Sequence, residues 1–329
     1  MHHGGVKKRI CVIGGGRWGE NHIRTLYEMG NLGAVVERDA KRLEELVRKY
    51  DLLKWHQSVE EAINEDYDGY VVATPAETHF LIGSFLLKHN RNVLIEKPLA
   101  LNSMDSWNLM QMGRKAGSVL MVGHLMLFHP AVKKIKELVD AGRLGKLEYI
   151  YSNRLNFGTV RSKENVFWSF APNDVSMLNY IIGSPPEYLT ASVGCFLQEG
   201  VHDCVIAHFR YPGNILGHVF VSWLHPFKEQ RLVVCGSKGM LVFEDTSLDR
   251  SILFFDRCMV MEDGKPIKKE GYVESIIYEP SHPLENELRY FIEHLDTGIT
   301  VADGKNGHET VKILEKVAEC LKTDLVGGR

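Results

Sequence analysis

The sequence predicts an α/β protein in which a doubly wound parallel sheet is followed by an α/β domain with a large, mostly antiparallel open sheet. Three observations support this prediction. Short apolar runs alternate with amphipathic helix patterns over the first part of the 329-residue chain, which is typical of parallel sheets covered by helices. The first run ends in a glycine-rich turn. Beyond residue 124 the strand-like runs become longer and follow one another directly, as antiparallel hairpins do.

The first half contains five expected strands and five expected helices in alternation. The strands are expected at residues 9–13, 32–37, 70–73, 92–95 and 119–122, and the helices at residues 20–29, 40–50, 59–64, 77–88 and 104–116. Short apolar runs of this kind are typical of strands buried on both faces. We therefore expect a nucleotide-binding type of domain over residues 1–124.

The second half changes in pattern, and we assign residues 125–329 to one further domain for substrate binding and oligomerisation. Helices are expected at residues 130–141, 168–182, 284–295 and 307–321, and strands at residues 147–153, 188–196, 201–211, 215–223, 230–235, 240–243 and 252–255. An open antiparallel sheet usually needs a cover, so we expect a homodimer or homotetramer.

Composition excludes several classes of function. A net charge of −3 and the lack of a basic run argue against nucleic-acid binding. We expect no membrane segment, because every apolar stretch is much shorter than the ~20 residues that a span needs, and the start shows no secretory signal. The six cysteines are scattered and no histidine pair has zinc-site spacing. We therefore expect a cytoplasmic protein without a metal.

A glycine-rich turn joins the first expected strand to the first expected helix, and it reads Gly14-Gly15-Gly16-Arg17-Trp18-Gly19. This fits the pattern G-x-G-x-x-G, in which Gly14 permits the tight turn, Gly16 lets a phosphate approach the backbone and Gly19 lets the helix pack on the strand. The N–H groups of the following helix can then face a pyrophosphate. We expect these three glycines, with Arg17 and Trp18, to bind a dinucleotide; an ordinary glycine turn is the alternative.

An acidic residue ends the second expected strand, close to the ~20-residue spacing expected after such a turn. This residue, Glu37, can accept hydrogen bonds from the ribose hydroxyls and would repel a 2′-phosphate. NAD is therefore the expected cofactor. The neighbouring Arg38 could hold a phosphate, so NADP remains the less favoured alternative. Glu37 could also be an ordinary solvated charge at the end of a strand, without a role in binding.

The segment Val93–Ala100 resembles the Glu-Lys-Pro signature of the Gfo/Idh/MocA oxidoreductases. Three other segments also resemble that family, and the similarity covers nearly the whole chain: Thr74-Pro75 with His79, Gly123-His124 with Phe128-His129-Pro130, and residues 285–321. The resemblance implies a Rossmann domain, an open-sheet second domain and NAD-dependent oxidation of a hydroxyl group. It places Thr74, Pro75, His79, Glu96 and Lys97 at the cofactor.

Lys97 is the expected centre of the chemistry. It follows a core parallel strand, at the edge where such sheets bind ligands, and Glu96 can orient it. An ammonium group there can polarise a substrate hydroxyl and relay its proton as hydride leaves. Lys97 is expected to contact both cofactor and substrate; a strand-ending turn without chemistry is the alternative.

A narrower resemblance covers residues 151–158, Arg161 and residues 164–172, and it is to the branch that oxidises the 3-hydroxyl of UDP-N-acetylhexosamines or their uronates. It implies substrate contacts from His124, Arg154, Asn156 and Arg161, since such groups suit polyols, carboxylates and diphosphates. The two arginines could equally be solvated surface charges.

The sequence departs from the family at one position. Most members have a histidine after the Ala-Pro pair, as a second proton-transfer residue, but this chain has Asn173 followed by Asp174. Asparagine forms hydrogen bonds and takes no proton at neutral pH. Either Lys97 works alone, or Asp174 or His124 helps, and Asn173 can orient the substrate.

Three functions remain open at this point. The first is a UDP-sugar 3-dehydrogenase for cell-surface polysaccharide synthesis, which gives a 3-keto nucleotide sugar. The second keeps the cofactor and changes the substrate to a free sugar or inositol. The third, motivated by Asn173, is a non-catalytic sensor that binds NAD and a nucleotide sugar.

Overall fold

The computed structural model describes residues 7–52, 54–162, 164–247 and 251–327. They form two compact units, here called unit 1 and unit 2. Unit 1 comprises the residues up to Leu125 together with Ser281–Lys312, and unit 2 comprises Met126–Pro280 together with the residues from Ile313 onward. The sequence placed all of residues 125–329 in one domain, whereas the structure groups Ser281–Lys312 with unit 1. A helical pattern shows which face of a helix is apolar and leaves open which sheet that face covers.

Unit 1 is built on a six-stranded sheet in the order β3-β2-β1-β4-β5-β6. All of its strand pairs are parallel. The strands are β1 (Ile10–Ile13), β2 (Leu32–Val36), β3 (Trp55–His56), β4 (Gly69–Val72), β5 (Val93–Glu96) and β6 (Leu120–Gly123). Every residue of β1, β4, β5 and β6 is buried, as expected for a parallel sheet with helices on both faces.

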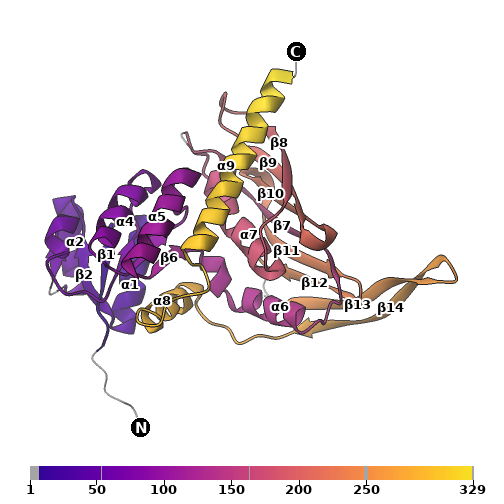
Figure 1. The fold of residues 1–329 in the computed structure, drawn as a ribbon, viewed down its shortest axis with the longest axis horizontal. Helices are drawn as coiled ribbons and strands as arrows, with labels where there is room; N and C mark the ends of the chain where they lie inside the picture. Colours follow the sequence, from indigo (N-terminus) through magenta and orange to yellow (C-terminus); the bar gives the residue numbers. More distant parts are fainter. Residues whose placement is uncertain (1–6, 53, 163, 248–250, 328–329) are drawn as a thin grey trace, which may run out of the picture. The chain divides into compact units, whose positions relative to one another are not determined.

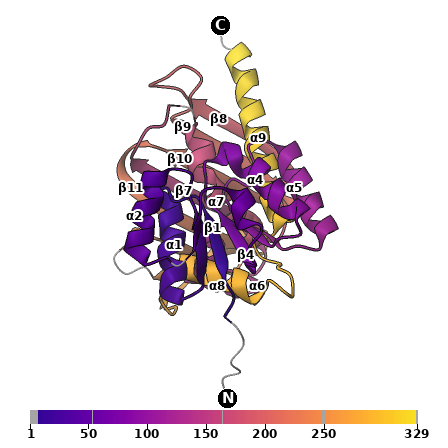
Figure 2. The same ribbon diagram turned by 90° about the vertical axis from the view of Figure 1, so that its left-hand side faces the viewer.

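Helices lie on both sides of this sheet: Figure 2 shows α1 and α2 on one side of β1 and β4, and α4 and α5 on the other. The helical elements of unit 1 are α1 (Arg17–Met29), α2 (Ala40–Tyr50), α3 (Val59–Ala62), η1 (Ala76–Thr78), α4 (His79–Lys88), α5 (Ser103–Ala116) and α8 (Pro283–Glu293). The predicted doubly wound sheet is confirmed. The short edge strand β3 was not predicted, because two residues are too few to show a period.

Unit 2 contains an eight-stranded sheet in the order β14-β13-β12-β11-β7-β10-β9-β8. Its only parallel pair among the described strands is β7 with β10, so the sheet is mostly antiparallel, as predicted. The strands are β7 (Leu147–Phe157), β8 (Tyr188–Gly194), β9 (Cys204–Tyr211), β10 (Ile215–Ser222), β11 (Leu224–Gly236), β12 (Gly239–Glu244), β13 (Ile252–Glu262) and β14 (Lys265–Ile276).

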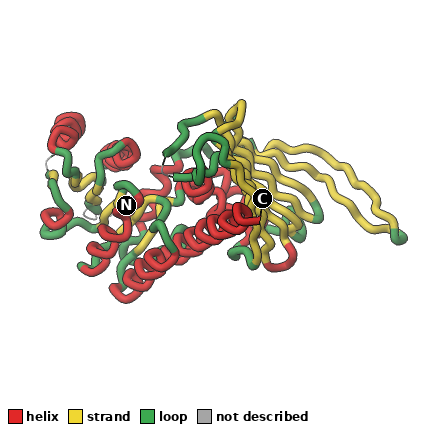
Figure 3. The backbone as a smooth tube through the Cα atoms, turned by 90° about the horizontal axis from the view of Figure 1, so that it is seen from above, coloured by secondary structure: helices red, strands yellow, loops and turns green. Residues whose placement is uncertain are grey.

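The strands β13 and β14 form a hairpin that extends beyond the other strands of the sheet (Figures 1 and 3). The strand β14 was not predicted. Nearly all of its residues are exposed, so it lacks the apolar alternation that marks a half-buried strand. Lysines such as Lys268 and Lys269 on this edge strand hinder pairing with another sheet.

One face of the unit 2 sheet is covered by α7 (Val166–Ile182). Val175 and Leu178 of this helix are packed in one core cluster with Val219 and Val221 of β10. The same cluster includes Ile313, Leu314 and Val317 from α9 (Gly304–Gly327), whose first residues belong to unit 1. The two remaining helical segments before β7 are η2 (Leu125–Phe128) and α6 (Pro130–Asp140).

Candidate active site

Three of the predicted segments meet at one edge of the unit 1 sheet, the edge formed by the carboxyl ends of the neighbouring strands β1, β4 and β5. These are the glycine-rich turn after β1, Thr74-Pro75 after β4, and Glu96-Lys97 at the end of β5. Ligands of open α/β sheets bind at this edge. The parallel topology therefore explains why segments far apart in the sequence meet here.

The glycine-rich turn has the geometry that the motif predicts. Gly14 has a φ of +101°, and a Cβ atom there would lie 2.7 Å from the Ala73 carbonyl oxygen. A Cβ on Gly19 would lie 2.0 Å from the Gly14 carbonyl oxygen, whereas a Cβ on Gly16 would meet no described atom within 4 Å. Gly16 also precedes α1 without a side-chain cap on the helix N–H groups. The turn therefore leaves open backbone where a pyrophosphate can approach.

Glu37 fixes the glycine-rich turn and also faces the cofactor cavity. Its Oε2 accepts from the Gly15 N–H at 2.7 Å and its Oε1 from the Asp39 N–H at 3.0 Å. Arg42 adds a second tether, because its Nε donates to the Gly15 carbonyl oxygen at 2.8 Å. Each Glu37 oxygen keeps a lone pair for a ribose hydroxyl.

A cavity of about 640 Å³ lies beside Glu37, within the usual size for a small-molecule or cofactor site. Its lining includes Gly14, Gly16, Glu37, Arg38, Thr74 and Pro75. The open backbone at Gly16 suits a pyrophosphate, and the Glu37 carboxylate suits the hydroxyls of a ribose. These residues therefore fit NAD.

His79 lies behind the cavity wall and does not line it. Its Nδ1 is 2.8 Å from the Pro98 carbonyl oxygen and its Nε2 is 2.9 Å from the Thr74 carbonyl oxygen. His79 is buried, and it joins the segment after β4 to the segment after β5. The predicted cofactor contact of His79 thus becomes a role in holding Thr74 and Pro98 in place.

Glu96 is the buried anchor of the catalytic segment. Its Oε1 accepts from Trp18 Nε1 and is 2.7 Å from His22 Nε2, while its Oε2 accepts from the Lys97 N–H at 3.1 Å. Burial alone would raise the pKa of Glu96, but the hydrogen bonds from His22 and Trp18 and the charge of Lys97 outweigh it and lower that pKa. A carboxylate anion therefore stands next to Lys97.

Two more ionisable groups are buried in the same unit. Burial lowers the pKa of His124 to about 3, against the opposing effect of Glu96, so its imidazole is neutral at neutral pH. Glu287 on α8 is fully buried, and burial, followed by the charge of Glu96, raises its pKa well above the ordinary value. A neutral His124 can accept or donate one hydrogen bond to a ligand.

In unit 2, Arg154 and Asp174 are paired with each other. Arg154 Nε donates to Asp174 Oδ2 at 2.7 Å and its Nη2 donates to Oδ1 at 3.1 Å, while Ser152 Oγ donates to Oδ1 at 2.6 Å. Asp174 is fully buried. Its oxygens are engaged, so the arrangement favours a positioning role for Asp174 over proton transfer.

The other predicted substrate residues of unit 2 differ in their surroundings. Asn156 on β7 and Asn173 on α7 each carry a buried Oδ1 without a hydrogen-bond partner in the described part of the chain. Such groups are available to a polar ligand. Arg161 is exposed and pairs with Glu164 at 3.3 Å, as a surface charge does.

Sequence reasoning missed His22, Arg42 and Glu287. His22 follows Trp18 by one helical turn, so the two side chains point the same way from α1. That spacing could have indicated a shared partner. Arg42 and Glu287 carry no local signal, because their partners come from distant segments.

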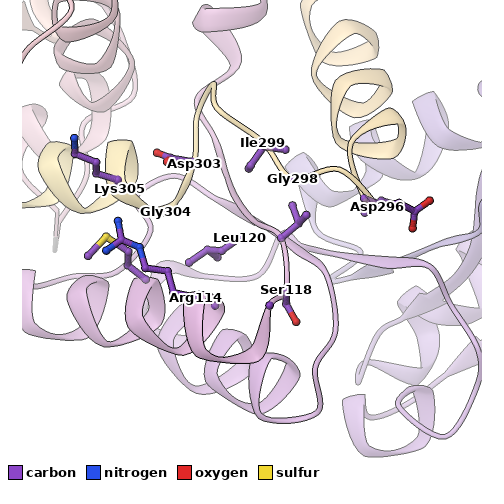
Figure 4. Close-up of a pocket in the computed structure, with 14 residues that line it drawn as sticks. Arg114, Ser118, Leu120, Asp296, Gly298, Ile299, Asp303, Gly304 and Lys305 are labelled. Carbon is purple, nitrogen blue, oxygen red and sulfur yellow. The ribbon is translucent and has the colours of Figure 1, made fainter.

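A second cavity, of about 270 Å³, lies at the amino-terminal end of β6, away from the carboxyl ends of the strands that carry the first cavity. Figure 4 shows Arg114 and Lys305 on one side of it and Asp296 on the other. It is smaller than the first cavity and far from the strand ends that carry Lys97. We therefore do not assign the reaction to it.

Membrane spans and metal sites are two further features to consider in the described residues. No described helix is both long enough and apolar enough to cross a membrane. No group of three or more His, Cys, Asp or Glu side chains in the described ranges could hold a metal ion.

Comparisons with known proteins agree with this geometry. Residues 8–124 match the model of an oxidoreductase family with an NAD-binding Rossmann fold, and residues 132–242 match the Gfo/Idh/MocA C-terminal domain. The chain is 27% identical to myo-inositol 2-dehydrogenase of Thermotoga maritima over 341 residues, covering 97% of this chain and all of the relative. It is 28% identical to trans-1,2-dihydrobenzene-1,2-diol dehydrogenase of Sus scrofa over 63% of this chain and 64% of the relative.

Solved structures share the fold. UDP-N-acetylglucosamine 3-dehydrogenase of Acidithiobacillus ferrooxidans superposes with a TM-score of 0.84 at 21% identity, covering 96% of this chain and 97% of the other. An oxidoreductase of Agrobacterium radiobacter, solved with NAD+, superposes with a TM-score of 0.78 at 15% identity over 95% and 97%. The family models together match more than half of the chain. The chain therefore belongs to the Gfo/Idh/MocA oxidoreductase family and is an NAD-dependent dehydrogenase acting on a CH–OH group.

Proposed function

We propose that this enzyme oxidises C3 of a UDP-N-acetylhexosamine, or of its uronate, to a 3-keto nucleotide sugar for cell-surface polysaccharide synthesis. The observation that carries the proposal is Lys97 at the carboxyl end of β5, next to the buried anion of Glu96. The substrate class is supported by the motif between β7 and α7 and by the fold shared with a UDP-N-acetylglucosamine 3-dehydrogenase.

Lys97 is the proton-transfer residue in this proposal. The bound nicotinamide supplies the hydride acceptor for the C3 hydrogen. The Lys97 amine takes the hydroxyl proton as the C3–O bond becomes a carbonyl, and Glu96 stabilises the resulting ammonium. The neighbouring anion compensates the charge that Lys97 gains, so the proton has a stable place within the protein.

The remaining predicted residues position the ligands. Asn173 and Asn156 offer partner-free amide oxygens to sugar hydroxyls, and the neutral imidazole of His124 adds one hydrogen bond. Arg154 keeps Nη1 for an anionic group of the substrate while Asp174 holds its Nε and Nη2. Arg161 is assigned to the diphosphate as the outermost contact. Arg17 and Trp18 border the pyrophosphate.

A free sugar or inositol is the second candidate substrate. It is favoured by the match to myo-inositol 2-dehydrogenase over 97% of this chain. Both candidates are polyols, and they differ in the nucleotide diphosphate. Recognition of that group is therefore the feature to test.

The proposal is tested by following NADH formation with a panel of UDP-sugars, free sugars and inositols. We expect turnover of a UDP-N-acetylhexosamine or its uronate, and its loss by roughly 10²–10⁴-fold in Lys97→Met with NAD binding retained. The exposed Lys88→Met is the matched control and should behave as wild type. Turnover of inositols alone would favour the second candidate. Binding of NAD and UDP-sugar without any turnover would favour the sensor.

We further propose that the enzyme is cytoplasmic and forms a homodimer or homotetramer. Cys11, Cys195, Cys204, Cys235 and Cys258 are free thiols, which suits a reducing compartment. The face of the unit 2 sheet opposite α7 carries large exposed side chains, including Tyr149, Tyr188 and Leu216. An apolar sheet face of this kind is usually covered by a partner.

A further inference from the structure

Glu287 is a buried acid that the reaction proposed above does not use. It lies on α8, which packs against α1, the helix that carries His22. Glu287 is 0% exposed, and neither of its carboxyl oxygens has a hydrogen-bond partner among the described residues. A buried carboxylate anion without a donor is strongly unfavourable, so its environment suits the neutral acid.

Glu96 presents the opposite environment in the same buried region. Three donors converge on its carboxylate, from Trp18, His22 and the Lys97 backbone. Its carboxyl group also lies directly over Gly123, where a Cβ would be 2.9 Å from Oε2. Glu96 is thus held in place and satisfied as an anion.

The two acids are electrostatically linked, since the charge of Glu96 acts on Glu287. Two neighbouring buried carboxyl groups rarely ionise together, and the one with fewer donors keeps the proton. Here the donors are all on Glu96. The pair therefore divides into one anion and one neutral acid.

We propose that Glu287 is a positioning residue of the Lys97 centre, which stays protonated so that Glu96 remains the single buried negative charge beside Lys97. A second anion would stabilise the Lys97 ammonium further and so reduce the share of neutral amine that can take the hydroxyl proton. Glu287 thus contributes by staying neutral, and it touches neither substrate nor cofactor.

Several titratable groups of the described residues lie on the elements around this pair. His22 comes from α1, Glu96 and Lys97 from the end of β5, and His124 from the end of β6. On α8 itself, Glu285 and Arg289 pair with each other at 2.5 Å. The fate of the Glu287 proton is therefore set chiefly by burial and by Glu96.

The charge of Glu287 can be measured directly in the protein without substrate. We would label the glutamate side-chain carboxyl carbons with ¹³C and follow their NMR shifts with pH. One carboxyl carbon should keep the shift of a protonated acid at neutral pH, and it should disappear in Glu287→Gln. The exposed Glu293→Gln on the same helix is the matched control and should leave the signal of the protonated acid in place.

A second variant keeps the test decisive if Glu287→Gln does not fold. In Glu96→Gln the neighbouring charge is gone, so the Glu287 signal should titrate at lower pH than in wild type. A Glu287 signal that titrates with the surface carboxylates would overturn the proposal. So would a Glu287 signal that titrates in Glu96→Gln at the same pH as in wild type, because the charge of Glu96 would then have no effect on Glu287.

The pH dependence of kcat is a second measurement, and it rests on the role proposed above for Lys97. It separates the effect of the charge of Glu287 from the effect of its size. Glu287→Gln, which is neutral and of similar size, should remove the decline of kcat at high pH that Glu287 ionisation causes in wild type, and a pH profile identical to that of wild type would contradict the proposal. A large fall in kcat at neutral pH would show that the acid itself is needed. The NMR result does not depend on the identity of the substrate, so it stands even if the UDP-sugar assignment fails.

Discussion

Asp174 shows how the partners of a side chain change the role that its sequence position suggests. It stands next to Asn173, the position at which most family members have a proton-transfer histidine. Its carboxylate is therefore a candidate for that proton transfer. In the structure both of its oxygens are taken by Arg154, and Ser152 adds a further donor. Its contribution is therefore to hold Arg154 on β7 in one orientation.

This pairing predicts a specific pattern of stability. Asp174→Asn should lower the free energy of unfolding by about 3–5 kcal/mol, because it leaves the Arg154 charge buried without its partner. The double variant Arg154→Met/Asp174→Leu should recover much of that loss, since both charges are removed together. Urea unfolding followed by circular dichroism measures all three proteins. A double variant no more stable than Asp174→Asn would contradict the pairing.

His124 predicts a pH dependence of stability. Its pKa is about 3 in the folded protein, below the ordinary value of about 6.5 in the unfolded chain. Between these values the unfolded state binds more protons, so stability falls as pH decreases through this window. The loss at pH 5 is up to about 2 kcal/mol.

The test compares thermal unfolding of wild type and His124→Gln between pH 5 and pH 8. The variant should lose less stability on acidification, because the neutral side chain has no proton to bind. The exposed His89→Gln should follow wild type at every pH. An unchanged acid dependence in His124→Gln would show that other groups cause it.

At the scale of elements, the glycine-rich turn predicts opposite effects for two alanine substitutions. Gly19→Ala should lower stability by about 1–3 kcal/mol or more, because its Cβ would lie 2.0 Å from the Gly14 carbonyl oxygen. Gly16→Ala should fold normally, because its Cβ points into open space. It should weaken NAD binding by roughly tenfold, since the methyl group stands where the phosphate approaches.

Calorimetric titration with NAD and thermal unfolding distinguish these two effects. Each variant is the control for the other, because a side chain at Gly19 disturbs packing within the protein whereas a side chain at Gly16 disturbs the approach of the ligand. Equal NAD affinity in Gly16→Ala and wild type would mean that the pyrophosphate does not pass over this residue.

The sequence could predict the elements that have a period or a strong stop signal. The strands of unit 1 other than β3, the helix Ala40–Tyr50 and the glycine-rich turn all have such signals. It could not predict β14, which is exposed along nearly its whole length, or the place of α8, whose apolar stripe does not identify the sheet it covers. The same limit hid Glu287, because a buried charge is recognisable only through neighbours from distant segments.

At the scale of the whole molecule, strand register shows which side chains lie together on the face of the unit 2 sheet opposite α7. His218 of β10 lies opposite His208 of β9 and Tyr151 of β7, and its ring stacks on Tyr151 with centroids 4.7 Å apart. Two residues back along β10, on the same face, Leu216 lies opposite Tyr149. These side chains point away from the face that α7 covers. Together with Arg210, which lies opposite Leu216, they form a surface of aromatic, histidine and apolar side chains, which we call the open face.

The open face predicts the effect of a charge placed at its centre. Leu216 is 51% exposed, and burying an arginine there without a counter-charge would be unfavourable in an assembly. Leu216→Arg should therefore reduce the molar mass measured by light scattering to that of one chain, while NAD binding by unit 1 is retained. Met259→Arg on the exposed hairpin is the matched control, because it adds the same charge outside the open face and should leave the mass unchanged. If Met259→Arg dissociates the protein and Leu216→Arg does not, the hairpin rather than the open face makes the contact between chains.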